Sequence, residues 1–276
     1  MSYDLFFEAG PGRTLDKKSF AAHFKGRRNY EVGNGQAVYQ NENTGVYFIF
    51  DEPSDEMVAF NLNFYRPHVF ALEAAAELEA LADAFRATVT DPQEGIGADG
   101  KFSREGFVRA WNEGNRFAYR SMVKEMDAVH TWPAKRIREV WEWNFARPSD
   151  EEMDSASVFV PSIFAVNMNG ELRSVAVWPP QCPVLLPAVD AVLVPLAQTG
   201  KASEEMALVP WDEVLPAVRQ YQEKAAGIAR YRLEFEDWPS DVAEFLNRKR
   251  KPMKKLEGVG LDEVLDRELV DAARKE

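Results

Sequence analysis

Val46-Tyr47-Phe48-Ile49-Phe50 (VYFIF) is the strongest strand pattern in this 276-residue chain. Its side chains are apolar or aromatic on both faces, which is typical of a strand at the centre of a sheet. Met57–Phe64 (MVAFNLNF) alternates apolar and polar residues and is expected to pair with it. Gly33-Asn34-Gly35 is a hairpin signal. Three further strands are expected in the same sheet: Tyr3–Glu8, Arg28–Val32 and Ala37–Gln40.

Two helices are expected to complete this N-terminal part. Thr14 or Asp16 supplies an N-cap for the first helix, and the Ala- and Leu-rich stretch Val69–Arg86 predicts the second. A short strand is expected at Ala87–Thr90. The sequence therefore predicts an α+β fold, with an N-terminal domain over residues 1–95 that contains a mixed or antiparallel sheet and two helices.

A C-terminal α+β domain is predicted over residues 100–276, after a Gly-rich break. It begins with a pair of helices over 103–147 that are expected to pack on each other. The first helix carries Gly106, Ala110 and Gly114 at intervals of four, a strip of small residues that lets another element approach closely. A helical middle that packs on both ends of the chain would instead make one body. The remaining elements are predicted as a hairpin around Asn169-Gly170, an extended segment at 184–196, and helices at 210–224, 239–247 and 261–273.

Side chains that usually perform catalysis or bind metals are sparse. The three histidines, His23, His68 and His130, lie in separate local patterns, and none has a second His or Cys at zinc-ligand spacing. Each is expected to be structural, unless the fold brings one beside a carboxylate. Cys182 lies in an apolar extended stretch and is expected to be an inert thiol. No catalytic residue, metal ligand or cofactor is predicted.

Gly95-Ile96-Gly97-Ala98-Asp99-Gly100-Lys101 is the sharpest chemical motif of the chain. It matches the glycine spacing of two phosphate-binding loops, G-x-G-x-x-G and G-x-x-x-x-G-K. The G-x-x-x-x-G-K loop needs Ser or Thr after the lysine, where this chain has Phe102. Asp99 would also direct a negative charge at the phosphates. A loop before a helix is the preferred interpretation, and nucleotide binding by Gly95–Lys101 is the alternative.

The chain is acidic, with a net charge of −12. Its dense basic run at 248–255 (RKRKPMKK) holds six positive charges, so the remainder carries −18. Such a body repels nucleic acid and anionic membranes and attracts basic partners. The alternative is that the acidic surface only keeps the protein soluble. The single cysteine and the lack of a secretory signal in the first residues favour a cytoplasmic protein.

Trp143 is predicted to bind a partner. It lies about 130° from the centre of the apolar stripe of its helix, at roughly 100° per residue, so it faces solvent or a second packing surface. A tryptophan beside acidic residues suits recognition of a basic partner. Burial of Trp143 in a second core is the structural alternative. The acidic residues that follow the helix are Asp150, Glu151, Glu152 and Asp154.

Five stretches carry a resemblance to a known class of protein: NENTGVYFIFDE (41–52), NFYRPHVFALEA (63–74), WNEGNRFAYR (111–120), WEWNFARP (141–148) and FVPSIFAVNMNGELRSVAVW (159–178). They resemble bacterial immunity proteins that are encoded beside type VI secretion toxins, including a partner of a nuclease-type toxin. The likeness spans most of the chain. These families share no catalytic motif, so the resemblance assigns no residue a role.

Two functions are therefore expected, from different classes. The first is a non-enzymatic inhibitor that binds and neutralises a cognate toxin, whose substrate groove would be basic if the toxin is a nuclease. The alternative is an enzyme or nucleotide-binding protein that uses Gly95–Lys101 and a histidine or carboxylate pair assembled by the fold. A histidine held against a carboxylate in a deep cleft would favour the alternative.

Overall fold

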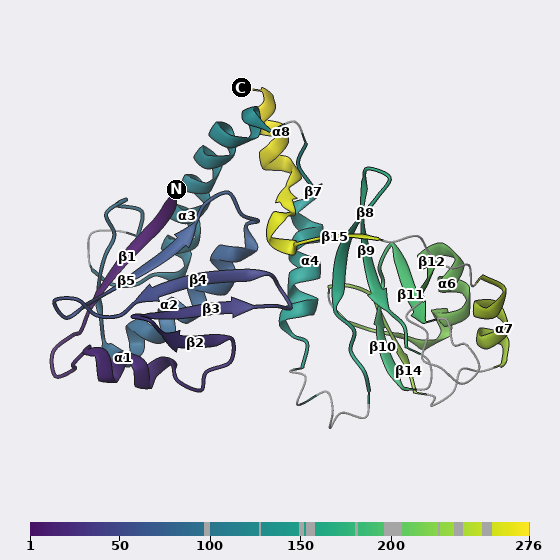
Figure 1. Cartoon of the computed structure of the whole chain (residues 1–276), viewed down its shortest axis with the longest axis horizontal. Helices are drawn as coiled ribbons and strands as arrows, with labels where there is room; N and C mark the ends of the chain where they lie inside the picture. Colours follow the sequence, from purple (N-terminus) through teal and green to yellow (C-terminus); the bar gives the residue numbers. More distant parts are fainter. Residues whose placement is uncertain are drawn as a thin grey trace. The chain divides into compact units, whose positions relative to one another are not determined.

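The computed structural model describes residues 1–96, 100–126, 128–148, 152, 158–179, 182–195, 206–225, 227–234, 240–249 and 256–275. The fold is α+β, as predicted. The chain divides into two compact units (Figure 1). Unit 1 comprises Met1–Ile137 together with Asp262–Glu276, and unit 2 comprises Arg138–Leu261.

This division differs from the predicted boundary at residues 95–100. The helix that was expected to open the second domain packs on the first sheet instead. The ring of Phe107 lies 5.6 Å from that of Tyr3 and 6.0 Å from that of Phe60, between centroids. The division falls inside α4 (Ala134–Phe145), so the two expected partner helices are not one pair within one domain.

Unit 1 contains, in chain order, β1 (Ser2–Glu8), α1 (Lys17–Phe24), β2 (Tyr30–Gly33), β3 (Gln36–Asn41), β4 (Val46–Asp51), β5 (Met57–Asn63), α2 (Val69–Phe85), β6 (Thr88–Thr90), α3 (Arg104–Met122), the 3₁₀ helix η1 (Val123–Glu125), β7 (Thr131–Trp132), β16 (Leu265–Asp266) and α8 (Arg267–Lys275). The 3₁₀ helix η3 (Leu261–Glu263) spans the division between the units. The strands and helices predicted before residue 126 all form, within a few residues of their expected bounds.

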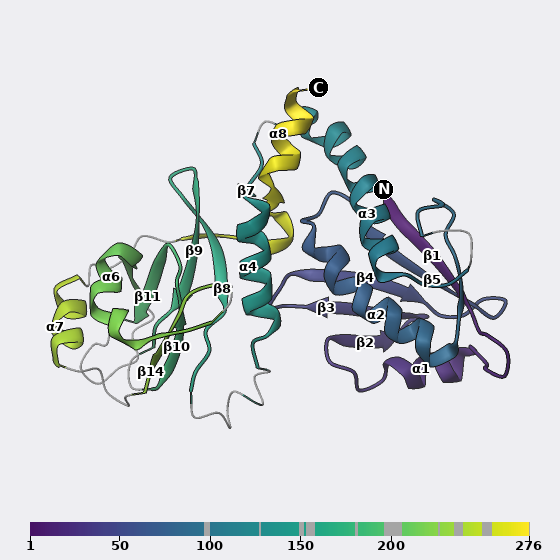
Figure 2. The same ribbon diagram turned by 180° about the vertical axis from the view of Figure 1, so that it is seen from behind.

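The six-stranded sheet of unit 1 is antiparallel throughout, in the order β2-β3-β4-β5-β1-β6. The VYFIF strand, β4, lies in the interior of the sheet, as predicted. Buried residues alternate with less buried ones along β1, β3, β4 and β5. Helices α2 and α3 lie over the buried face, which Figure 2 shows from behind. The sheet is therefore covered by helices on one side.

The strip of small residues on α3 allows other segments to approach the helix closely, as its spacing predicts. A Cβ atom at Gly114 would lie 2.4 Å from the ring of Phe64, and one at Gly95 would lie 2.1 Å from the Cβ of Ala110. Because neither distance leaves room for a methyl group, the absence of side chains lets the end of β5 and the loop before α3 lie directly against the helix.

The predicted terminal helix over 261–273 is only partly correct. Residues 261–266 form η3 and β16, and the helix α8 begins at Arg267. Strand β16 pairs in parallel with β7, a tertiary contact that overrides the helical pattern of the local sequence. A hydrophobic cluster joins this segment to α3 through Tyr119, Val123, Leu265, Val270 and Ala273.

Unit 2 contains β8 (Ile163–Met168), β9 (Glu171–Val177), β10 (Val184–Pro187), β11 (Ala191–Pro195), β12 (Met206–Pro210), α6 (Trp211–Val218), the 3₁₀ helix η2 (Arg219–Tyr221), β13 (Gln222–Glu223), β14 (Arg230–Leu233), α7 (Ser240–Lys249) and β15 (Glu257–Val259), besides most of α4. The predicted hairpin is β8–β9, and its turn residues Asn169 and Gly170 have φ angles of 56° and 85°. Positive φ at both positions explains the Asn-Gly pair.

Two sheets form the body of unit 2. A five-stranded sheet has the order β12-β11-β9-β8-β15, in which only the β9–β11 pair is parallel among the described strands. A three-stranded antiparallel sheet has the order β10-β14-β13. No helix in the described part of the chain has both the length and the apolar composition needed to cross a membrane.

Gly95→Ala is expected to destabilise unit 1 by about 1–3 kcal/mol, because its Cβ would overlap the Cβ of Ala110 and neither group can rotate away. Gly33→Ala is the matched control, since no atom lies within 4 Å of the added Cβ. Amide hydrogen exchange of β1–β5 in increasing urea measures the change for unit 1 alone. Equal stability of the two variants would contradict this packing.

Candidate functional site

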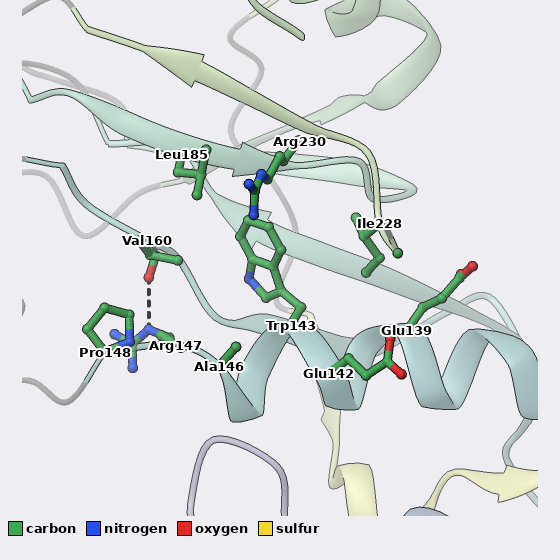
Figure 3. Close-up of a pocket in the computed structure, with 11 residues that line it drawn as sticks. Glu139, Glu142, Trp143, Ala146, Arg147, Pro148, Val160, Leu185, Ile228 and Arg230 are labelled. Carbon is green, nitrogen blue, oxygen red and sulfur yellow. Dashed lines mark hydrogen bonds between the residues drawn. The ribbon is translucent and has the colours of Figure 1, made fainter. Parts of the chain in front are cut away.

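A pocket of about 360 Å³ lies within unit 2, between the C-terminal half of α4 and the three-stranded sheet. Figure 3 shows the indole of Trp143 standing up from α4 toward Arg230, with Leu185 and Ile228 on either side of it. The remaining lining comes from Glu139, Glu142, Ala146, Arg147, Pro148, Val160 and Gly227. Trp143 is half-buried and forms the central wall of the pocket.

Hydrogen bonds from α4 to the chain before β8 hold this wall in place. Trp143 Nε1 donates to the carbonyl of Pro161 at 2.8 Å, and Arg147 Nε donates to the carbonyl of Val160 at 2.8 Å. The fully buried amide of Asn144 donates to the carbonyl of Ile163 at 3.0 Å and accepts from its N–H at 2.9 Å. This explains why a polar residue interrupts the apolar stripe of the helix. The indole is thus fixed before any ligand binds.

Charged residues of both signs line the pocket: Glu139, Glu142, Arg147 and Arg230. Arg230 Nε lies 2.9 Å from Glu223 Oε2. A hydrogen bond from Arg232, together with the charges of Arg232 and Arg230, lowers the pKa of Glu223. Glu139 and Glu142 follow one another at i and i+3 on α4, beside Trp143. The pocket therefore combines an aromatic wall and aliphatic side chains with two carboxylates at one end, a lining that can receive a long side chain with a cationic tip.

The structure places the predicted partner-binding residues in different ways. Trp143 is half-buried and lines the pocket together with Leu185 of β10 and Arg230 of β14, and its binding of a partner stays a prediction. Glu152 is exposed. Asp150, Glu151 and Asp154 lie outside the described residues, so their position relative to Trp143 stays a prediction.

The Gly95–Lys101 loop is described only in part, because residues 97–99 lie outside the described residues. The carboxylate of Asp91 accepts hydrogen bonds from the backbone N–H groups of Gly95 and Ile96 at 2.7 and 2.9 Å, and from the hydroxyl of Tyr3 at 2.5 Å. Amides that would bind a phosphate in a phosphate loop are thus satisfied by an internal anion. Together with the close approach of Gly95 to Ala110, this favours a packing role for Gly95.

A histidine and a carboxylate that are 198 residues apart in the sequence meet in unit 1. His68 Nδ1 lies 2.5 Å from Asp266 Oδ1, and the backbone N–H of His68 donates to Asp266 Oδ2 at 2.8 Å. Asp266 is 2% exposed, and the hydroxyl of Tyr119 accepts from its backbone N–H at 3.3 Å. Both carboxylate oxygens hold residue 68, so the pair ties the C-terminal segment to the start of α2. No local pattern could reveal a pair so far apart in sequence.

His23 belongs to a second polar cluster, between α1, β2 and α2. Arg27 bridges His23 Nε2 at 2.7 Å and Glu77 Oε2 at 2.6 Å, and the hydroxyl of Tyr30 donates to the same Glu77 oxygen at 2.9 Å. Burial and the charge of Arg27 lower the pKa of His23 to about 4. A neutral imidazole that accepts from a guanidinium supports a structural role for this histidine.

A third polar cluster surrounds the carboxylate of Glu73, which is 2% exposed on α2. Tyr39, Asn41 and Thr44 all donate to its Oε1 atom, at 2.7, 2.7 and 3.2 Å. These donors come from β3 and the turn after it, so the cluster fastens the β3–β4 hairpin to the helix. The alternating pattern of β3 indicates a buried Tyr39 but not its partner.

The remaining chemical candidates lie apart from the pocket. The carbonyl of His130 accepts from the N–H of Leu265 at 2.9 Å, which holds β16 beside β7. Burial raises the pKa of the Cys182 thiol, which makes it a poorer nucleophile. Among the described residues, no group of three His, Cys, Asp or Glu side chains is arranged to hold a metal ion.

We compared the chain with protein families, curated proteins and solved structures. No family model, no curated protein and no solved structure matches the chain.

Asp266→Ala is expected to destabilise the C-terminal segment of unit 1 by about 2–4 kcal/mol, because it leaves two donors of residue 68 without their partner. Asp271→Ala on the following helix, α8, is the control, since Asp271 is exposed. Amide hydrogen exchange of β16 and α8 measures the loss. Unchanged protection in Asp266→Ala would show that the pair does not hold the segment.

Stability is expected to fall as the pH is lowered from about 6.5 toward 4, because unfolded His23 binds a proton in this range and folded His23 does not. The contribution is on the order of 1–2 kcal/mol once partial solvent exposure is allowed for. His23→Gln keeps an acceptor for Arg27 but cannot titrate, so its free energy of unfolding should fall less over this range. Identical pH dependence in the two proteins would contradict the assignment.

Proposed function

We propose that this chain is a non-enzymatic binding protein that inhibits a cognate protein partner, of the kind represented by immunity proteins that neutralise bacterial toxins. The observation that carries the proposal is the Trp143 pocket, in which an aromatic wall is fixed by hydrogen bonds to the chain before β8. Tryptophan in a preformed, partly desolvated pocket is the residue type that contributes most to protein interfaces. A cytoplasmic location belongs to the same proposal.

The charge of the chain supports this assignment. A net charge of −12 repels nucleic acids and draws basic proteins to the molecule by long-range attraction. Glu139 and Glu142 lie at the edge of the pocket, where a lysine or arginine of a basic partner would reach them after its aliphatic part has passed the indole. A toxin that cleaves nucleic acid must carry such basic residues in its substrate groove.

A second candidate is an enzyme that uses His68 and Asp266. A histidine oriented by a buried carboxylate is the arrangement that activates nucleophiles in many hydrolases. The pair favours this candidate by geometry, yet none of the described residues hydrogen-bonds to His68 Nε2, the atom that would act as the base. Hydrolysis of ester or phosphodiester substrates that is lost in His68→Gln, with unfolding unchanged, would support this candidate over inhibition.

Trp143→Ala is expected to weaken binding of the protein encoded by the neighbouring gene by about 2 kcal/mol or more, which is roughly thirtyfold in Kd. Phe145→Ala is the control, because Phe145 lies two residues further on the same helix and is 44% exposed, outside the pocket. Titration calorimetry of the purified proteins in moderate salt measures both. Absence of tight association between the wild-type proteins would overturn the proposal.

A further inference from the structure

The face of the six-stranded sheet in unit 1 that is opposite α2 and α3 carries apolar residues as well as polar ones. The VYFIF strand is apolar on both sides, but only Val46, Phe48 and Phe50 are buried among its apolar residues. Ile49 points to the opposite face, over which none of the described helices of unit 1 lies (Figures 1 and 2). The ring of Tyr47 instead contacts that of Phe70 on α2, at 5.6 Å between centroids. An antiparallel sheet with one solvated face usually places polar residues there, so Ile49 requires an explanation.

The strand register gathers these residues into one patch. Ile49 lies opposite Val38 on β3 and opposite Asn61 on β5, and Phe6 lies opposite Ala59. All five residues are half-buried. Four of them give the middle of the face an apolar centre formed by Phe6, Val38, Ile49 and Ala59, which we call the open-face centre.

Carboxylates surround this centre. Asp4, Glu8, Glu31 and Asp51 lie on the same face, and the strands contribute no lysine or arginine to it. Asp4 accepts from the amide of Asn61 at 2.6 Å and Asp51 from that of Gln36 at 2.9 Å. None of the four forms an ion pair with a described residue. The positive charge at the border is Arg66, which hydrogen-bonds to the hydroxyl of Tyr47 at 2.9 Å.

An apolar centre with a rim of one charge sign is the composition of a docking surface. The charges also select the occupant. A second copy of the chain would bring four carboxylates against four carboxylates, which is unfavourable. A surface with lysine or arginine around an apolar centre would pair with the rim and cover Ile49 and Phe6.

We infer that the open face of this sheet docks a basic protein surface, with the open-face centre as its core and Asp4, Glu8, Glu31 and Asp51 as its rim. This inference rests on the proposed function: the open face would be the surface, and a basic protein the partner, through which that function acts.

The test uses the full chain and a displayed library of random peptides as the probe. Selected binders are expected to be rich in lysine or arginine interspersed with apolar residues, and to bind more weakly as salt is raised. The double variant Glu8→Lys/Glu31→Lys should weaken them by at least about tenfold, since both side chains are exposed on the rim. Ile49→Thr, which keeps a β-branched side chain, should weaken them similarly.

The control is Glu113→Lys/Asp271→Lys, which changes the net charge equally at two exposed acidic residues on α3 and α8. Urea unfolding of each variant confirms that the sheet is intact. Binders that are weakened by Trp143→Ala but not by the open-face variants would overturn this inference and leave the proposed function standing. Failure to select any basic binder that the open-face variants weaken also overturns it.

Discussion

Burial of a single face of the six-stranded sheet is the constraint on which unit 1 depends. The alternation of β1, β3, β4 and β5 directs one set of aromatic side chains toward α2 and α3, and the residues between them to the opposite face. Close approach of α3 requires the missing side chains at Gly95 and Gly114. The same approach brings Tyr119 beside the C-terminal segment, where Asp266 holds residue 68. The packing of α3 on the sheet thus positions both the helix and the terminal segment, and it leaves the opposite face of the sheet open.

In unit 2, hydrogen bonds fix the side chain that forms the wall of the pocket. Trp143 and Asn144 at the end of α4, and Arg147 just after it, donate hydrogen bonds to backbone carbonyls of residues 160–163. A helix fastened in this way cannot rotate without breaking buried hydrogen bonds, so the indole keeps its direction. Rigid aromatic walls lose little conformational entropy on binding, which is why such residues anchor protein interfaces.

The local patterns of the sequence predicted most helices and strands because their periodicity is determined by short-range geometry. The direction of Trp143 followed from its place on the helix, while its pocket needed β10 and β14 from later in the chain. The His68–Asp266 pair joins residues 198 positions apart, which no local pattern can detect. The apolar spacing over Leu261–Asp266 is that of an amphipathic helix, yet Leu265 and Asp266 form a strand because they pair with β7. VYFIF predicted a central strand correctly but not that one of its apolar faces stays uncovered.

We propose that this molecule acts by presenting surfaces to a basic protein. The most direct measurement is hydrogen–deuterium exchange of the chain alone and in complex with the product of the neighbouring gene. Binding through these surfaces should add protection on the strands of the open face and at the end of α4, around Trp143. Complex formation that leaves both regions unprotected and instead protects the surroundings of His68 and Asp266 would contradict it.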